Sequence, residues 1–577
     1  MLRLKVGALA ATAAMLFAAC GSSATPSPAA SAPPASTGPT AAGSTPAPTP
    51  SPSSSAIKDG GNLVMALPGD IASTDTAFIQ DSNSSSVSNN VMEGLVTTKP
   101  GTTGEVVGAL AKSWTESPDG LTYTFELYDG VKFHDGTDFN AAAVCVNYDR
   151  WRNFTGALAS PDYSYYYAAV FGGYGKDSNN VSCTASSPTE VVLKLGHPYS
   201  PFLLSQTIST FAIASPKALK DGDADNADPT KSPYGTGGTG AMVGTGPFKF
   251  KEWVPSDHVT IVKNADYYKK DQLAHVDQVT FKFYPDQTAT LNALQAGDVD
   301  IASIINPVDV KTVQADSKLQ SIDRGESCNL FHLGLNETHK PFDNLKIRQA
   351  VAYAINKQAL IDTFYGGQAV VAKTWMPMGA QYAKDENLPT YDPAKAKQLI
   401  ADSGVPASEL TFDFWYPAAV SRPYMPDPKG IFQAISADLE AVGFKINAQT
   451  KPWRPDYLKE EATGKYPMWL IGWTCDWAGP DNFLDTAFFY YSGGKPNPEF
   501  AYKNDALNTT MKAAEAATDP ATAQSLWEKA QDMIAADLPT VPLINSTPPA
   551  AAAAYVKGYV GSGNLTEPLN LVWLDKP

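Results

Sequence analysis

The sequence predicts an α/β protein with two lobes. Residues 57–577 follow an N-terminal region of low complexity, and a segment of that length is too long for one hydrophobic core. A helical pattern from about Asp286 to Ala296 stops at Gly297 and is followed at once by the strand-like residues 299–301. A helix that leads into a short strand is typical of α/β folds.

The first twenty residues have the pattern of a secretory signal. Arg3 and Lys5 precede an uncharged stretch, residues 6–19, which is too short to span a bilayer as a mature helix. Small residues then precede Cys20, and this arrangement resembles a lipobox, although Phe17 is less usual at its position. The resemblance implies that Cys20 is diacylated and becomes the mature N-terminus, and two acyl chains give stable anchoring. The alternative is an ordinary cleavage site that happens to lie near a cysteine.

Residues 21–56 form a predicted tether. They contain only Ser, Ala, Pro, Thr and Gly, so there is no charge and no large apolar side chain whose burial could offset the cost of ordering the chain. Fully extended, such a segment would reach on the order of 110 Å. We expect a disordered tether that lets a folded domain meet a membrane partner.

The composition and the missing motifs exclude several function classes. The formal net charge of −16 makes nucleic acid or an anionic lipid surface an unfavourable partner. The sequence contains no GxxxxGK[ST] loop, no GxSxG elbow and no HExxH helix. Residues 235–240 match GxGxxG in letters, but no apolar strand precedes them, so we expect a surface loop. The six histidines form no metal-spaced cluster. The sequence therefore predicts no enzyme activity, no cofactor and no metal.

Four cysteines remain if Cys20 carries lipid, an even number that suits an oxidising compartment. Three pairings of Cys145, Cys183, Cys328 and Cys475 are possible. We favour Cys145–Cys183, which falls within one region of sequence. Its complement, Cys328–Cys475, would join the start of the second lobe to a strand described below. Free buried thiols are the alternative.

Residues 111–144 carry the most informative pattern. Polar and apolar positions alternate around residues 123–127, and turns follow at Asp129-Gly130 and Asp135-Gly136, which predicts a hairpin ladder closed by Asp-Gly turns. In order, the segment contains Trp114, Ser117-Pro118-Asp119-Gly120, Tyr123-Thr124-Phe125, Gly130-Val131-Lys132-Phe133-His134-Asp135-Gly136 and Phe139. This order closely resembles the signature of family 5 extracellular solute-binding proteins, the peptide-type receptors of ABC importers.

Later segments extend the resemblance over nearly the whole mature domain. They are residues 243–250 with Trp253, residues 264–268, and the helix entry 341–344 with residues 347–350. The resemblance implies a two-lobed periplasmic-binding-protein-like fold of type II (cluster C), with an extra inserted subdomain in lobe I. The expected segments are 57–95, 243–325 and 540–577 in lobe I, 96–242 in the inserted subdomain, and 326–539 in lobe II.

Apolar periodicity and caps predict further helices in the second half. One helix is expected from near Asn344 to Gly366-Gly367, with its apolar face at Ile347, Val351, Ile355 and Ile361. Another carries Ile431, Ile435, Leu439 and Val442 and ends before Gly443. Asp392-Pro393 and Asp519-Pro520 mark helix starts with proline at the first helical position.

The predicted ligand-binding residues lie between Trp415 and Phe483. Strand 470–475 ends at Asp476 and is similar to the Gly-Trp-x-x-Asp strand of peptide-binding members, whose aspartate meets the α-amino group of the peptide. Residues 421–426 resemble the Arg-Pro-Tyr segment of dipeptide receptors, whose arginine meets the ligand carboxylate, and Arg422 is the matching residue. The expected site residues are Asp476, Arg422, Trp473, Gly472, Thr474, Tyr424 and Asn482. Five of the eleven tryptophans fall in this region, at 415, 453, 469, 473 and 477, and core packing is the alternative for each.

The two charges suit a zwitterion, because a zwitterion that leaves water must have both of its charges paired. Many peptide receptors continue with Asp-Pro-Asp-Asn, whereas this chain has Ala478-Gly479-Pro480-Asp481, which removes one carboxylate and weakens the case for a strict dipeptide ligand. A hinge salt bridge or a turn is the alternative role for Arg422. Strand-end capping or an internal ion pair is the alternative for Asp476.

The sequence therefore predicts a monomeric extracytoplasmic receptor that captures short peptides between its lobes. Its partners would be an ABC permease and ATPase subunits encoded elsewhere, and the lipid anchor would hold it on the outer face of the cytoplasmic membrane. One alternative is an oligosaccharide or other uncharged solute, because stacked indoles suit sugar faces. Another is a secreted hydrolase that uses carboxylates such as Asp476 and Asp481. A sensor that presents its ligand to a membrane kinase or regulator would have the same sequence features as an importer's receptor.

Overall fold

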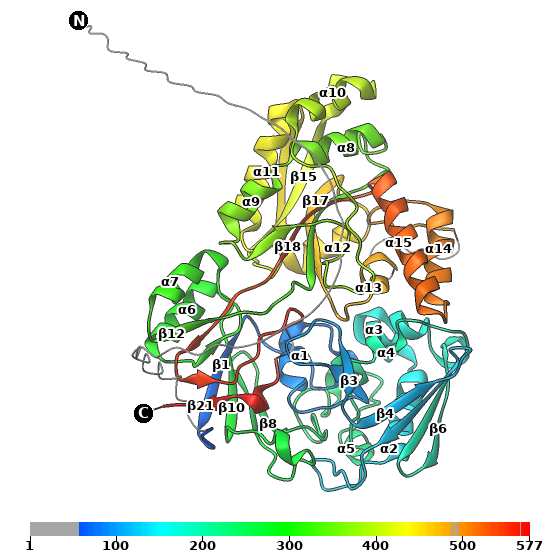
Figure 1. The fold of residues 1–577 in the computed structure, drawn as a ribbon, viewed down its shortest axis with the longest axis vertical. Coiled ribbons are helices and arrows are strands. Elements are labelled where there is room, and N and C mark those ends of the chain that lie inside the picture. Colours follow the sequence, from blue (N-terminus) through cyan, green and yellow to red (C-terminus); the bar gives the residue numbers. More distant parts are fainter. Residues whose placement is uncertain (1–56, 486–488, 490, 492–493, 566, 577) are drawn as a thin grey trace, which may run out of the picture. The chain divides into compact units, whose positions relative to one another are not determined.

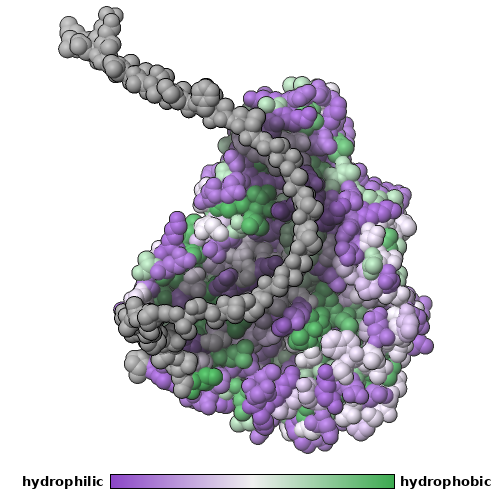
Figure 2. Space-filling model, in the orientation of Figure 1, coloured by the Kyte–Doolittle hydropathy of each residue, from purple (hydrophilic) through white to green (hydrophobic). Residues whose placement is uncertain are grey.

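The computed structural model describes residues 57–485, 489, 491, 494–565 and 567–576. The predicted signal peptide, the lipidation of Cys20 and the tether at 21–56 lie outside the described residues. Over the described ranges, no helix is both long and apolar enough to cross a membrane. On the face drawn in Figure 2, hydrophilic residues predominate around helices α8 (Leu345–Ala354) and α10 (Pro393–Ser403).

Lobe I is built on a seven-stranded sheet in the order β12-β19-β11-β1-β10-β9-β8. Its strands are β12 (Leu319–Ile322), β19 (Ala550–Ala553), β11 (Ile301–Ala302), β1 (Asn62–Leu67), β10 (Gln278–Phe283), β9 (His258–Lys263) and β8 (Phe248–Val254). Both ends of the described chain therefore contribute strands to one sheet (Figure 1).

Strand β1 shows why this sheet is buried on both faces. Leu63, Met65 and Leu67 pack into one apolar cluster, whereas Val64 and Ala66 pack into another on the opposite face. This alternation follows from the two-residue period of a strand. The second cluster includes side chains of α6 (Gln287–Ala296) and α7 (Val310–Ala315). Helix α6 begins after its N-cap Asp286 and ends at Gly297, whose φ of 81° suits glycine.

The inserted subdomain contains a four-stranded antiparallel sheet in the order β4-β5-β7-β6. Its elements are β4 (Ala111–Glu116), β5 (Thr122–Leu127), β6 (Asn180–Ser187) and β7 (Glu190–Leu195), with α2 (Ala141–Arg152), α3 (Pro161–Phe171), α4 (Phe202–Ser205) and α5 (Pro216–Asp221). Two short strands, β2 (Val96–Thr98) and β3 (Val106–Gly108), pair nearby in sequence.

The predicted hairpin ladder for residues 111–144 is confirmed only at its second turn. Gly136 donates its N–H to the carbonyl of Phe133, so Asp135-Gly136 closes a short hairpin, whereas residues 123–127 do not pair with residues 131–133 across Asp129-Gly130. Strands β4 and β5 form a hairpin across the turn at residues 117–120, as Gly120 donates its N–H to the carbonyl of Ser117. The ladder does not continue through the turn at 129–130, because the free edge of β5 is taken by β7. Residues 131–139 form one isolated bridge, between Lys132 and Asp138.

Lobe II is built on a six-stranded mixed sheet in the order β14-β18-β13-β17-β15-β16. Its strands are β14 (Ala369–Val371), β18 (Val541–Ser546), β13 (Asn329–Leu335), β17 (Met468–Thr474), β15 (Thr411–Ala418) and β16 (Lys445–Pro452). The helices of this lobe include α8, α10, α9 (Lys357–Phe364), α11 (Pro428–Val442), α12 (Leu458–Glu461), α13 (Pro480–Leu484), α14 (Asp505–Glu515) and α15 (Pro520–Asp537). Lobe II was expected to end at residue 539, but strand β18 lies after that residue and still pairs in the lobe II sheet. The chain therefore returns to lobe I with β19.

The single helix expected from Asn344 to Gly366 is two helices, so that prediction was wrong. Helix α8 ends before Ile355, and α9 begins after Asn356, whose side chain accepts a hydrogen bond from the N–H of Ala359. A new N-cap therefore interrupts an apolar period that continues on both sides of it. Helices α10 and α15 begin at Asp392-Pro393 and Asp519-Pro520, and α11 ends at Gly443, where φ is 117°.

Candidate ligand-binding site

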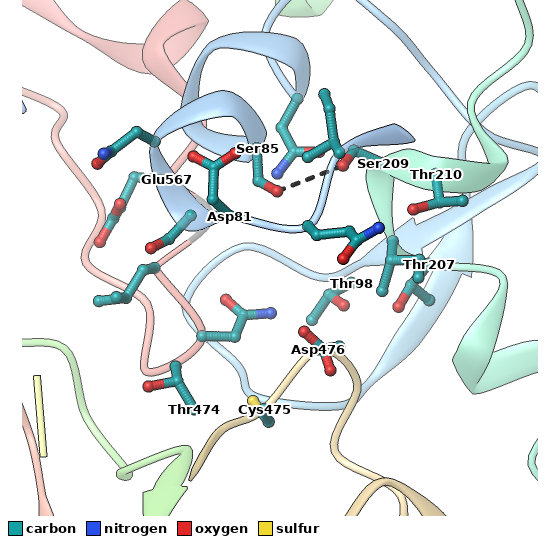
Figure 3. Close-up of a pocket in the computed structure, with 18 of the residues that line it drawn as sticks. Asp81, Ser85, Thr98, Thr207, Ser209, Thr210, Thr474, Cys475, Asp476 and Glu567 are labelled. Carbon is teal, nitrogen blue, oxygen red and sulfur yellow. Dashed lines mark hydrogen bonds between the residues drawn. The ribbon is translucent and has the colours of Figure 1, made fainter. Parts of the chain in front are cut away.

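A cavity of about 1060 Å³ lies between the two lobes within the folded part of the chain. Lobe I contributes α1 (Ser82–Ser88), the β2–β3 pair and residues 207–210, while lobe II contributes residues 419–424, 453–461 and 471–476. In Figure 3, Thr474 and Asp476 approach the cavity from one side, and Asp81 and Ser85 lie on the opposite side. A small molecule held there would contact both lobes.

Strand β17 forms much of the lobe II wall, and its end requires a glycine. A Cβ atom on Gly472 would lie 2.4 Å from the carbonyl oxygen of Leu330 and 2.5 Å from the ring of Tyr424. The absence of a side chain thus lets the buried Tyr424 pack against the strand. The hydroxyl of Tyr365 donates a hydrogen bond of 2.8 Å to the carbonyl oxygen of Tyr424.

Asp476 lines the cavity directly after β17 and is held by neutral donors. Its Oδ1 accepts a hydrogen bond from the Tyr166 hydroxyl, and its Oδ2 accepts one of 3.0 Å from Asn482 Nδ2. The side-chain oxygen of Asn482 accepts from both the Asp476 N–H and Trp473 Nε1, each at 3.1 Å. Burial raises the pKa of Asp476 to about 6, against the lowering effect of these hydrogen bonds.

Arg422 lies over two aromatic rings on the same wall. Its Cζ is 5.3 Å from the centroid of the Trp453 ring and 5.9 Å from that of Tyr424. Backbone hydrogen bonds of 3.0 and 2.9 Å with Met425 hold the turn that carries it. Among the described residues, its Nε has no hydrogen-bond partner. The guanidinium group is thus a positioned cation with unused donor capacity.

The structure separates the five tryptophans by role. Trp453 and Trp473 line the cavity. Trp469 and Trp477 are buried, with 0% and 2% of their surface exposed. Trp415 stacks on Tyr466 at 4.4 Å between ring centroids. Core packing therefore accounts for the last three.

Two glutamates, Glu461 and Glu499, also line the cavity. Glu461 accepts a hydrogen bond of 2.8 Å from Trp469 Nε1, and its carboxyl group interacts electrostatically with that of Glu499. Burial and mutual repulsion raise the pKa of Glu461, and burial raises that of Glu499 to about 7. Over the described ranges, no three metal-binding side chains come together, and no cavity-lining residue is a histidine.

Most of the predicted site residues meet at this cavity, including Asp476, Arg422, Tyr424, Gly472, Trp473 and Thr474. Asn482 lies behind Asp476 and orients it. Four further features of the cavity wall were not predicted: Tyr165 and Tyr166 of the inserted subdomain, Asp81, which caps α1, and the Glu461–Glu499 pair. Four tyrosines within residues 163–167 were the signal that could have identified the first two.

The structure also places the four cysteines of the folded part. Cys145 on α2 is bonded to Cys183 on β6, and Cys328 is bonded to Cys475, with Cα atoms 5.1 and 5.4 Å apart respectively. Cys475 lines the cavity. The second bond therefore lies at the site itself.

Comparisons with known proteins agree on one family. A family model described as bacterial extracellular solute-binding proteins, family 5 Middle, matches residues 105–495. The chain is 30% identical to heme-binding protein A of Haemophilus influenzae, over 84% of this chain and 87% of that protein. It is also 30% identical to di/tripeptide-binding protein 1 of Pseudomonas aeruginosa, over 84% of this chain and 89% of that protein. Among solved structures, the ABC transporter-associated periplasmic binding protein DppA from Helicobacter pylori, in complex with the peptide STSA, matches with a TM-score of 0.74 and 28% identity. That match covers 90% of this chain and 99% of that one.

Proposed function

The chain belongs to the family 5 bacterial extracellular solute-binding proteins, and from that premise we propose that it is the receptor of an ABC importer that captures short peptides between its lobes. A membrane permease and its ATPase subunits, encoded elsewhere, would take up the ligand. The family is one of binding proteins and not of enzymes. One relative is named for heme and another for di- and tripeptides, so the choice of ligand rests on this chain's own residues.

The observation that carries the peptide proposal is a pair of opposite charges in one cavity. Asp476 is held by neutral donors only, and the Arg422 guanidinium lies over aromatic rings, so neither charge is neutralised by a described residue. Charged groups removed from water require partners, and a peptide brings an ammonium and a carboxylate group. Asp476 would receive the α-ammonium group, and Arg422 would hold the carboxylate with two parallel hydrogen bonds. Trp473, Thr474 and Tyr424 would complete the wall around them.

Native mass spectrometry tests this proposal. Residues 57–577 are purified gently so that bound ligand is retained, and the ligand is then released and its mass measured. We expect a ladder of masses that fragment as short peptides. Binding of a synthetic dipeptide should be weakened more than tenfold by Asp476→Asn and by Arg422→Ala, with little change in melting temperature. Equal losses of binding and stability would make the two residues structural. Release of a sugar series, with binding that survives both substitutions, would favour an uncharged solute held by Trp453 and Trp473.

The N-terminal region supports a finer proposal on location. An acylated Cys20 and the tether at 21–56 would hold a monomeric receptor on the outer face of the cytoplasmic membrane. Expression of the full chain should therefore place it in the membrane fraction, with an N-terminal fragment that carries two or more acyl chains by mass. Cys20→Ala should move it to the soluble fraction, and an unmodified wild-type N-terminus would contradict the anchor.

A further inference from the structure

The segment of residues 476–482, which follows β17 in lobe II, is docked on the inserted subdomain. Trp477 has 2% of its surface exposed and belongs to the apolar core of that subdomain, together with Phe125 and Phe202. Its ring lies edge-on to Tyr166 of α3, with centroids 6.5 Å apart. A side chain of one lobe is thus part of the core of the other.

Asp481 provides a buried polar contact in the same place. It is fully buried, and its carboxylate accepts hydrogen bonds from the Tyr199 hydroxyl and, at 3.0 and 3.1 Å, from Trp477 Nε1. A buried carboxylate needs such donors, and Tyr199 comes from the inserted subdomain. The neighbouring Ser200 donates from its N–H to the carbonyl of Glu515 at 2.6 Å, which adds a second crossing between the lobes.

Asn482 connects this docked segment to the cavity. It follows Asp481 in α13, and its amide accepts from the Asp476 N–H and donates to Asp476 Oδ2. The other oxygen of Asp476 accepts from Tyr166, which belongs to the subdomain on which Trp477 packs. The orientation of the Asp476 carboxylate is therefore determined from both lobes.

We propose that residues 476–482 form a latch by which the inserted subdomain completes the amine-binding site. Trp477, Asp481 and Tyr199 act as positioning residues, because Trp477 packs in the core of the subdomain and Asp481 accepts the Tyr199 hydrogen bond across the two lobes. Tyr166 then orients Asp476 and leaves lone pairs of that carboxylate for the ligand's ammonium group. The identity of the ligand in this inference rests on the proposed function, whereas the contacts of the latch are independent of it.

The latch links ligand affinity to a contact that the ligand does not touch. A ligand shifts a two-state protein toward the closed form only because it binds that form more tightly than the open one. If the closed form is destabilised, fewer molecules are ready to bind and the apparent affinity falls. Loss of one hydrogen bond to a charged group should weaken binding by about tenfold or more. Tyr199→Phe removes that donor while it keeps the ring.

The experiment measures dipeptide affinity by calorimetry for residues 57–577 and for the variants Tyr199→Phe, Asp481→Asn and the double variant. We expect about tenfold weaker binding in Tyr199→Phe, a loss in Asp481→Asn as well, and a less than additive loss in the double variant, because both substitutions weaken the Tyr199–Asp481 hydrogen bond. The matched control is Tyr148→Phe, whose buried hydroxyl donates to Gln206 within the inserted subdomain. That control should bind as the wild type does.

A second measurement distinguishes a positioning role from a structural one and does not depend on the ligand. Spin labels on cysteines placed at the exposed Lys176 in the subdomain and Lys395 in lobe II report the distance between lobes. Tyr199→Phe should shift the ligand-free population toward longer distances, whereas Tyr148→Phe should not. If the wild type binds no peptide but Tyr199→Phe still opens the lobes, the proposed function fails and the latch stands. Unchanged distances and affinity in Tyr199→Phe would overturn the latch.

Discussion

Cys475 is joined by a disulfide to Cys328, and its N–H donates a hydrogen bond of 2.7 Å to the carbonyl oxygen of Cys328. Cys328 directly precedes β13, the first strand of lobe II, and Cys475 directly follows β17. The point at which the chain enters lobe II is thus fixed to the residue before Asp476. Any movement of this entry would be passed to the carboxylate in the cavity.

Removal of this bond should lower both stability and affinity. Replacement of both Cys328 and Cys475 by serine opens a loop with a sequence separation of 147 residues, which should cost roughly 2–5 kcal/mol of unfolding free energy. It should also weaken ligand binding, because Asp476 loses its fixed neighbour. The matched control is the pair Cys145→Ser and Cys183→Ser, which should lower the melting temperature but leave affinity unchanged. Equal affinity in both double variants would show that the Cys328–Cys475 bond has no role at the site.

The affinity for peptides should fall in acid. Burial raises the pKa of Asp476 to about 6, so below that pH the ligand-free carboxyl group holds a proton that must leave before an ammonium group can bind. We expect the affinity to be nearly constant from pH 6.5 to 7.5 and to fall by up to about tenfold for each pH unit below 6. Asp476→Asn should remove this slope, whereas Asp402→Asn, an exposed change on α10, should retain it. An acid slope that survives in Asp476→Asn would assign the titration to another group.

Local signals in the sequence predicted much of this fold, and non-local contacts account for what was missed. Gly297 and Gly443 end helices because their backbone is left-handed, which the residue type itself indicates. The apolar run before Asp476 likewise predicted a strand that ends at an acid. Asn356 was harder to recognise as a helix cap. The apolar residues keep a helical spacing on both sides of it, so the sequence gives no sign that one helix ends and another begins there. Tyr166 meets Asp476 across 310 positions, and Glu461 meets Glu499, so no local pattern could place them together.

Arg422→Lys should discriminate between charge and geometry at the carboxylate end of the site. Lysine keeps the positive charge but loses the planar group that lies over Trp453 and Tyr424 and can grip a carboxylate with two bonds. Peptides with a free C-terminus should bind about tenfold more weakly, while C-terminally amidated peptides should show little change. Arg152→Lys, which lies outside the cavity, serves as the control. An equal loss for both kinds of peptide would mean that Arg422 does not meet the carboxylate.

The Glu461–Glu499 pair should make the protein less stable as the pH rises. Burial raises the pKa of Glu499 to about 7, well above its usual 4.5. Between pH 4.5 and pH 7 the Glu499 carboxyl group is therefore protonated in the folded state but ionised in the unfolded state. The free energy of unfolding should therefore fall from pH 4.5 to 7 and level off above it. Glu499→Gln cannot ionise, and it should stabilise the protein at pH 8 by on the order of 1 kcal/mol, with little effect at pH 4. Melting temperatures at the two pH values, compared with the exposed control Glu440→Gln, measure this difference. A Glu499→Gln variant that is less stable than the wild type at pH 8 would show that the carboxylate makes a contact worth more than the repulsion it causes.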